Sequence, residues 1–208
     1  KFVAAKFHSS RHETPVDTVV IHYTAGRGDE LGLARFFASG TRQASAHLGI
    51  GRQGRVIQMV ELDRMAWHAG VSSFEGVSGV GQRSIGIEIC NTGWAYTSKL
   101  PHERQFSGEH RNPASTSLVW EAYTDEQISS LNVLLRELTI VIPTLKYITG
   151  HEDIRNTSTV VGIKGSKLDP GPAFPWHKIC SDIDLEQHHF SFVKKQWYVT
   201  SHGTSPQE

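Results

Sequence analysis

Two short runs of β-branched and aliphatic residues constrain the fold of this 208-residue chain more than any other feature. They are 17-DTVVIHY-23 and 84-SIGIEICN-91. Each run has the length of a strand and is rich in Val and Ile, which is typical of strands buried inside a sheet. We predict that the first run is a buried strand ending at His22 or Tyr23. The second is apolar enough to lie at the centre of the sheet.

Two other segments space their apolar residues as helices do. Residues 29–39 begin with acidic side chains and stop at Gly40, a common helix terminator. Residues 124–142 begin with Thr124 followed three positions later by Gln127, the pattern of a capping box. We therefore predict helices over both segments.

Further strands are expected on either side of the central run. Residues 45–61 predict two strands joined by a glycine-containing turn, and residues 146–154 predict another strand. Glycines in the first segment spell GxGxxG, but a strand pattern follows them where a dinucleotide site requires a helix. Strands alternating with helices predict an α/β fold, with a single mixed central β-sheet flanked by helices.

Composition limits the domain organisation and the partners. We expect one domain over residues 1–183, with a polar insertion at about 97–117, and a C-terminal extension over 184–208 with a disordered end. No apolar run approaches the roughly 18–20 residues of a membrane span, so we expect no integral membrane segment. The 21 basic and 21 acidic side chains balance, which gives no electrostatic reason to expect a nucleic-acid partner.

Three potential metal ligands stand where an apolar strand pattern meets a loop: His22, His151 and Asp169. Catalytic zinc commonly takes three nitrogen or oxygen ligands from the protein and leaves a fourth position open. Pro170 biases the backbone of Asp169 toward an extended form, which would hold the carboxylate in place. Taken singly, each histidine also fits a hydrogen-bonded structural residue, and the proline-rich segment also fits a rigid surface turn.

Six segments in a fixed order carry a resemblance to a known family. They are VVIHYTAG, SAHLGI, AWHAGVS, SIGIEICN, GHEDI and KLDPGPAFPW. The chain resembles the zinc-dependent N-acetylmuramoyl-L-alanine amidases, which include AmpD-like enzymes, phage lysozyme amidases and peptidoglycan recognition proteins. The resemblance covers roughly residues 15–180 and is strongest with the AmpD-related periplasmic or outer-membrane branch.

This resemblance implies the fold of the recognition proteins and a zinc ion held by the three ligands named above. It further implies that Glu88 is the general base and that Lys167 donates a hydrogen bond to the oxyanion. A glutamate in an otherwise apolar strand is costly to bury unless it is paired or used, which agrees with a catalytic role. Ala46 stands where the phage and recognition branches have a catalytic tyrosine, so no tyrosine is assigned here.

Three further residues are predicted to bind substrate: His47, Trp67 and His68. An aromatic ring beside an imidazole at a strand end can line a groove for a sugar or a peptide, and the resemblance places this segment near the active site. A purely structural role is the alternative, with Trp67 in the core and His47 buried and hydrogen-bonded.

The predicted reaction is hydrolysis of the amide between the lactyl group of N-acetylmuramic acid and L-alanine of the peptidoglycan stem peptide. The substrate is then peptidoglycan or a soluble muropeptide, and the oligomeric state stays open. A noncatalytic peptidoglycan-binding protein is the main alternative, and a zinc peptidase acting on the stem peptide is a weaker one. The substrate indicates a periplasmic or other extracytoplasmic location, with cytoplasmic muropeptide recycling and a phage endolysin as alternatives.

Overall fold

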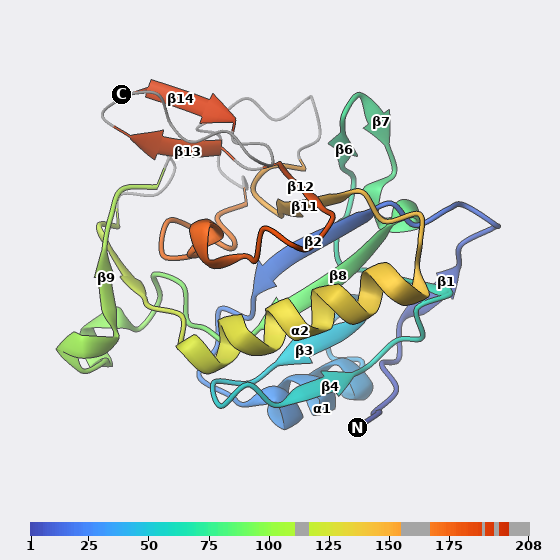
Figure 1. Cartoon of the computed structure of the whole chain (residues 1–208). Helices are drawn as coiled ribbons and strands as arrows, with labels where there is room; N and C mark the ends of the chain where they lie inside the picture. The colour runs from blue at the N-terminus through green and yellow to red at the C-terminus, as the bar shows by residue number, and fades with distance from the viewer. Residues whose placement is uncertain (111–116, 155–166, 189, 194–195, 200–208) are drawn as a thin grey trace.

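A six-stranded sheet forms the centre of the computed structural model (Figure 1), which describes residues 1–110, 117–154, 167–188, 190–193 and 196–199. From one edge to the other its strands are β12 (Glu186–His188), β11 (Tyr147–Gly150), β2 (Thr18–Tyr23), β8 (Ser84–Ile89), β3 (Leu48–Ile50) and β4 (Val56–Gln58). Neighbouring strands run parallel except β3 and β4, which form an antiparallel hairpin. The predicted mixed sheet is thus confirmed, with β2 and β8 at its centre.

The β3–β4 hairpin confirms the interpretation of the glycine-rich segment as a turn. Gly54 has a φ of 74°, which a residue with a side chain rarely adopts. At the opposite edge, β12 pairs in parallel with β11, so the sheet continues past residue 183. The predicted disordered end, residues 201–208, lies outside the described residues.

Two helices cover opposite faces of the sheet. α2 (Asp125–Val141) lies across the front in Figure 1, and α1 (Glu30–Ser39) lies behind β4. Both begin at an N-cap residue: Asp29 accepts a hydrogen bond from Gly32 N–H, and Thr124 forms the predicted capping box with Gln127. The helix predictions are confirmed to within one residue at either end.

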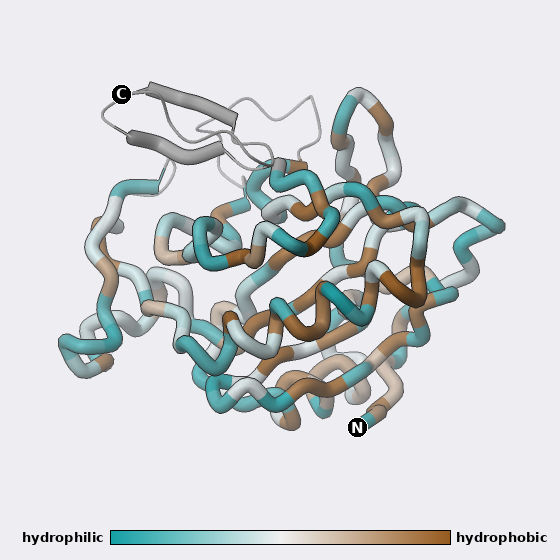
Figure 2. The backbone as a smooth tube through the Cα atoms, in the orientation of Figure 1, coloured by the Kyte–Doolittle hydropathy of each residue, from teal (hydrophilic) through white to brown (hydrophobic). Residues whose placement is uncertain are grey.

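The two faces of the central strands carry different residues because side chains alternate along a strand. The isoleucines of β8 and residues Val19 and Ile21 of β2 pack in one cluster with the buried leucines of α2. Val20 belongs to a separate cluster with Phe74 and Val80. Hydrophobic residues therefore concentrate in the central strands and α2 (Figure 2). By the same alternation, the even-numbered residues of β2 and β8 face away from α2.

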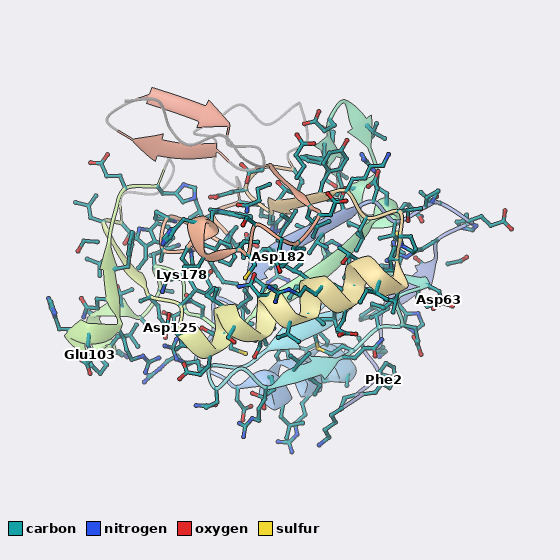
Figure 3. The ribbon with its side chains drawn as sticks, in the orientation of Figure 1. Phe2, Asp63, Glu103, Asp125, Lys178 and Asp182 are labelled. Atoms are coloured by element: carbon teal, nitrogen blue, oxygen red, sulfur yellow. The ribbon has the colours of Figure 1, made fainter. Side chains whose placement is uncertain are left out.

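Short elements complete the described structure. They are β1 (His8–Ser10), β5 (Arg64–Ala66), β6 (Ser73–Phe74), β7 (Val77–Ser78), the 3₁₀ turns η1 (Val80–Arg83) and η4 (Trp176–Lys178), β13 (Phe190–Val193) and β14 (Gln196–Val199). An exposed ion pair of 2.7 Å joins Lys178 to Asp125 at the start of α2 (Figure 3). Exposed pairs of this kind contribute little to stability, so the packing of buried Trp176 in the core holds η4 in place. Within the described ranges, no helix has the length and apolar character needed to cross a membrane.

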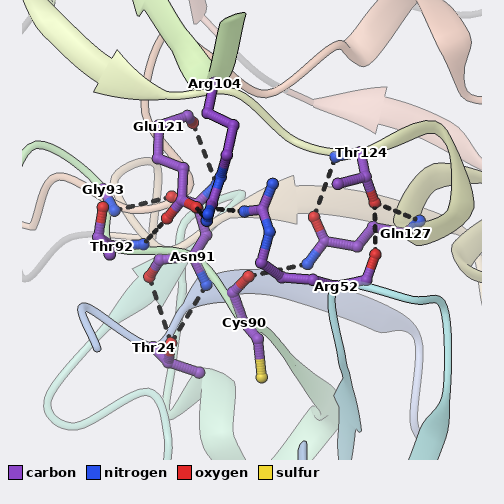
Figure 4. Close-up of polar contacts among 10 residues, drawn as sticks. All are labelled: Thr24, Arg52, Cys90, Asn91, Thr92, Gly93, Arg104, Glu121, Thr124 and Gln127. Atoms are coloured by element: carbon purple, nitrogen blue, oxygen red, sulfur yellow. Dashed lines mark hydrogen bonds and ion pairs between the residues drawn. The ribbon is translucent and has the colours of Figure 1, made fainter. Parts of the chain in front are cut away.

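The described part of the predicted polar insertion contains short elements and is fixed to the sheet by a polar network. It contains η2 (Thr97–Lys99), η3 (His102–Arg104) and β9 (Gln105–Ser107), which pairs with β10 (Val119–Glu121). Glu121 is 1% exposed and forms ion pairs with Arg52 and Arg104, and it accepts a hydrogen bond of 2.5 Å from Thr92 N–H (Figure 4). One buried carboxylate thus ties the insertion to the β3–β4 turn and to the segment after β8.

Candidate metal centre and active site

Three predicted ligands meet at one point of the structure. His22 Nδ1, His151 Nδ1 and Asp169 Oδ2 lie 2.9 Å from one another in all three pairs. His22 and His151 are buried, and Asp169 is 13% exposed. Residues far apart in the sequence, at positions 22, 151 and 169, therefore present one ligand atom each to a common centre.

Strand register explains why the two histidines meet. β2 and β11 are parallel neighbours in which Gly150 pairs with Ile21. The next residue of each strand is a histidine, so both imidazoles lie side by side at the carboxyl end of the sheet. A shift of one residue in this pairing would separate them.

Backbone contacts place Asp169 beside the histidines. Its carbonyl accepts a hydrogen bond of 2.8 Å from Glu152 N–H, directly after His151. The carbonyl of Pro170 accepts one of 2.9 Å from the Tyr123 hydroxyl. Gly150 leaves the room for this approach, because a Cβ there would lie 2.6 Å from Pro170 Cδ.

The three ligand atoms are arranged to bind a cation, and they cannot all form favourable hydrogen bonds with one another. If both Nδ1 atoms carry protons, the two N–H groups face each other. If only one does, the bare Nδ1 faces the carboxylate. Every proton arrangement of neutral imidazoles thus leaves at least one repulsive contact at 2.9 Å. A metal ion removes this conflict, since lone pairs from two imidazoles and a carboxylate are the ligands that zinc takes.

Glu88 and Lys167 line the same pocket as the ligands. The pocket has a volume of about 290 Å³, and the predicted site residues in its lining are His22, Trp67, His68, Glu88, His151, Lys167 and Asp169. Glu88 lies directly across from His22 in the β2–β8 register. Its Oε2 is buried and has no hydrogen-bond partner among the described residues. A carboxylate oxygen without a partner, beside a metal site, is placed to accept a proton.

Burial controls the protonation of these groups. It raises the pKa of Glu88 to about 8, with a further contribution from Asp169 and an opposing one from Lys167. The metal-free carboxyl is therefore mostly protonated at pH 7, and a cation held by the neighbouring ligands would favour the ionised form that a general base requires. Burial also lowers the pKa of His22 to about 4, which keeps this imidazole neutral and able to bind a metal. For Asp169 burial acts to raise the pKa, but the two histidines outweigh it and hold the pKa below the usual range.

The three predicted substrate residues differ in exposure. Trp67 is 38% exposed at the pocket, where it stacks on Phe7 with ring centroids 5.5 Å apart. His68 is 8% exposed, and both of its ring nitrogens make hydrogen bonds within the protein. His47 has no exposed surface, and its Nδ1 accepts the Gly86 N–H at 2.9 Å. The structure thus gives His47 a role in joining strands, and its contact with substrate stays a prediction.

Two features near the site were not predicted from the sequence. Ser84 and Gly86 lie on the same face of β8 as Glu88, and both adjoin His68. Strand alternation could have identified both residues, because every second residue before Glu88 lies on the same face of the strand. On the other side, Nε2 of buried His110 in the insertion makes a hydrogen bond with Oε2 of Glu152, the neighbour of His151. No local pattern predicts that contact across 42 residues.

Two histidines at the carboxyl ends of parallel strands and a loop carboxylate form a group able to hold one metal ion, beside a glutamate whose Oε2 has no hydrogen-bond partner among the described residues. Such a ligand set is of the kind found in metal-dependent hydrolases. The chain belongs to the N-acetylmuramoyl-L-alanine amidase family, whose model matches residues 12–172. This family is in general zinc-dependent, and the chain has a His/His/Asp group able to hold a metal ion.

Individual relatives agree with this family. The chain is 31% identical over 147 residues to 1,6-anhydro-N-acetylmuramyl-L-alanine amidase AmpD of Salmonella typhimurium (strain SL1344), covering 70% of this chain and 60% of that protein. A crystal structure of a Se-Met AmpD derivative has a TM-score of 0.60 at 26% identity, covering 86% of this chain and 91% of the other. AmpDh3 from Pseudomonas aeruginosa, solved in complex with anhydromuramic pentapeptide, has a TM-score of 0.56 at 27% identity, covering 82% and 59%. These likenesses confirm the amidase fold.

Proposed function

We propose that this protein is a zinc-dependent amidase that cleaves the bond between the lactyl group of N-acetylmuramic acid and L-alanine of the stem peptide. The observation that carries the proposal is the meeting of His22, His151 and Asp169 at 2.9 Å in the pocket that Glu88 also lines. Because the chain spans 60% of the AmpD relative from Salmonella, family membership alone does not carry the whole activity over.

His22, His151 and Asp169 would hold the zinc ion. Zinc at that point supplies Lewis-acid polarisation of the amide carbonyl and lowers the pKa of water. Glu88 accepts a proton from the attacking water through its free Oε2 and then delivers it to the amine of L-alanine as the C–N bond breaks. The Lys167 ammonium donates to the oxyanion formed at the former carbonyl oxygen. The products are a free lactyl carboxylate and a peptide with a free amino terminus.

A peptide-bearing muramyl compound is the substrate class we infer. The AmpDh3 structure holds an anhydromuramic pentapeptide, and the AmpD relative is named for a 1,6-anhydro-muramyl substrate. A noncatalytic binding protein is less favoured, since it would need neither the three-ligand centre nor a glutamate held with an unpaired oxygen beside it. Since peptidoglycan lies outside the cytoplasmic membrane, we place the activity there, with cytoplasmic recycling of soluble muropeptides as the competing location.

Mass spectrometry of the reaction products tests the proposal. The protein is incubated with purified sacculi and, separately, with a soluble anhydromuramyl tripeptide. An amidase releases free lactyl carboxylates and intact stem peptides beginning with L-alanine. Cleavage inside the stem peptide would instead identify a peptidase, and binding without any product would identify a recognition protein.

Metal removal provides the second test. Dialysis against a chelator is expected to abolish hydrolysis, and one equivalent of zinc is expected to restore it. His151→Ala is the matched variant, since it removes one ligand and should prevent the recovery. Full activity in the metal-free protein would contradict the proposed chemistry.

A further inference from the structure

A line of hydrogen bonds continues from His22 on the side away from the ligand cluster. His22 Nε2 lies 3.0 Å from His68 Nδ1, and His68 Nε2 lies 3.1 Å from Ser84 Oγ. The Ser84 hydroxyl in turn donates to the carbonyl of Val80 at 2.6 Å. All three side chains in this line are at least nine-tenths buried, so water does not compete for their hydrogen bonds.

The last group in the line fixes every proton before it. A carbonyl oxygen only accepts, so the single proton of the Ser84 hydroxyl points to Val80. Ser84 Oγ must then accept from His68, which places the His68 proton on Nε2. His68 Nδ1 is left as an acceptor, and the proton of His22 is therefore on Nε2. His22 consequently presents a bare Nδ1 to the ligand cluster.

Packing holds the His68 ring in this position independently of the hydrogen bonds. The ring lies on Gly86, where a Cβ would stand 2.5 Å from His68 Cγ and 2.7 Å from Nδ1. Only glycine leaves that space. His47 meets the same ring with centroids 5.7 Å apart and planes at 71°. Glycine at position 86, in the middle of the central strand β8, thus leaves the space that the His68 imidazole occupies.

We infer that His68 is a positioning residue, which fixes His22 in the tautomer that binds the metal through Nδ1 and which is itself oriented by Ser84. The inference rests on the proposed metal site, where it assigns the tautomer of one ligand. Groups behind a ligating histidine commonly set its orientation and basicity, and their loss typically costs about 10- to 100-fold in metal affinity. His68 therefore acts through His22, without touching the reacting atoms.

Nuclear magnetic resonance of the metal-free wild-type chain tests the tautomers directly. With ¹⁵N-labelled histidine at neutral pH, two-bond ¹H–¹⁵N correlations distinguish a protonated ring nitrogen from a bare one. We expect the proton on Nε2 in both His22 and His68. A proton on Nδ1 of either residue would overturn the inference, and this result does not depend on zinc binding or on hydrolysis.

Zinc affinity, measured by competition with a chromophoric chelator, tests the consequence. His68→Leu removes the acceptor and is expected to weaken zinc binding about 10- to 100-fold. His68→Asn offers an amide oxygen in place of Nδ1 and should recover most of that loss. Ser84→Ala leaves His68 without its orienting partner and should weaken binding by a smaller factor, while Ser84→Thr keeps the hydroxyl and should resemble the wild type.

Thr149→Val is the matched control. Thr149 is fully buried on strand β11, which pairs with β2, and its hydroxyl has no hydrogen-bond partner among the described residues. Its replacement should leave zinc affinity unchanged. Wild-type affinity in His68→Leu would overturn the inference, as would an equal loss in His68→Leu and His68→Asn. If the wild type binds no zinc, the proposed function fails, and the tautomer measurement still decides the inference about His68.

Discussion

Replacing Glu88 by glutamine should separate the cost of this residue to stability from its value to catalysis. Glutamine has nearly the same shape, but it neither ionises nor accepts a proton from water. Burial raises the pKa of Glu88 from 4.5 to about 8 in the folded protein, and an unfolded chain would restore the ordinary value. Ionising this carboxyl therefore disfavours folding.

The size and the sign of the effect follow from that difference in pKa. Below pH 4.5 the carboxyl is protonated in both states and costs nothing. As the pH rises toward 8 the unfolded chain loses the proton first, so the stability of the wild type falls by about 1.4 kcal/mol for each pH unit. At pH 7 the accumulated penalty is about 3 kcal/mol. Glu88→Gln removes this pH dependence, and the metal-free variant should be more stable than wild type by about that amount at pH 7.

Urea denaturation of both metal-free proteins between pH 4 and pH 8 measures the difference. The other titrating groups are common to both chains and cancel in the comparison. Hydrolysis by the zinc-loaded variant is expected to fall by about 10²- to 10⁴-fold, as for the loss of a general base. A stability difference that does not change with pH would refute the burial argument. Near-normal turnover would refute the assignment of Glu88 as the base.

Three further substitutions test other parts of the structure. Lys167→Met removes the proposed oxyanion donor and should lower kcat about 10²- to 10³-fold without changing zinc content, which metal analysis checks; an unchanged kcat would remove Lys167 from the mechanism. Gly86→Ala places a Cβ against the His68 ring at 2.5 Å and should destabilise the fold by about 1–3 kcal/mol in urea denaturation; wild-type stability would show that the ring can move aside. Glu121→Gln keeps the shape but removes the charge between two arginines, and should cost about 1–3 kcal/mol, whereas an unchanged urea midpoint would mean that the insertion is held by other contacts.

The main elements of the fold could be predicted because each carries its own local pattern. Thr18–Tyr23 is a β-branched run, and Asp125–Val141 is a capped segment with apolar residues at helical spacing. Both bury their apolar side chains in the same core cluster.

For strand β5 the sequence indicates only that Trp67 and His68 stand at a strand end, and it gives neither the bounds nor the partner of that strand. It is three residues long, and its partner β1 lies 56 residues away, so only the folded chain brings Ala66 opposite His8. Strand β9 was not predicted because it is only three residues long and lies in the polar insertion, where no strand pattern stands out.

In the candidate site, too, some features could be predicted from the sequence and others could not. His22 and His151 could be chosen from the sequence because each follows a strand pattern in a recognisable motif. Asp169 was chosen on its motif KLDPGP, but the expected strand before it is absent, since residues 167–169 form no strand. Which nitrogen of His22 faces the cluster depends on the groups around its ring, and those groups come from other strands. The position of His68 was likewise open, since it follows from the space left at Gly86. The sequence therefore indicated which residues meet in the pocket, but not the hydrogen bonds between them, and their roles stay predictions.

The division of the central strands into two faces also bears on how this protein could be engineered. Along β2 and β8 the odd-numbered residues pack against α2, while His22 and Glu88 project from the other side. Repacking the α2 side, for example around Ile87 and Leu131, changes volumes that no ligand atom touches. We therefore expect thermal stability and turnover to be separable: substitutions confined to the α2 side should change stability without altering the residues that line the pocket.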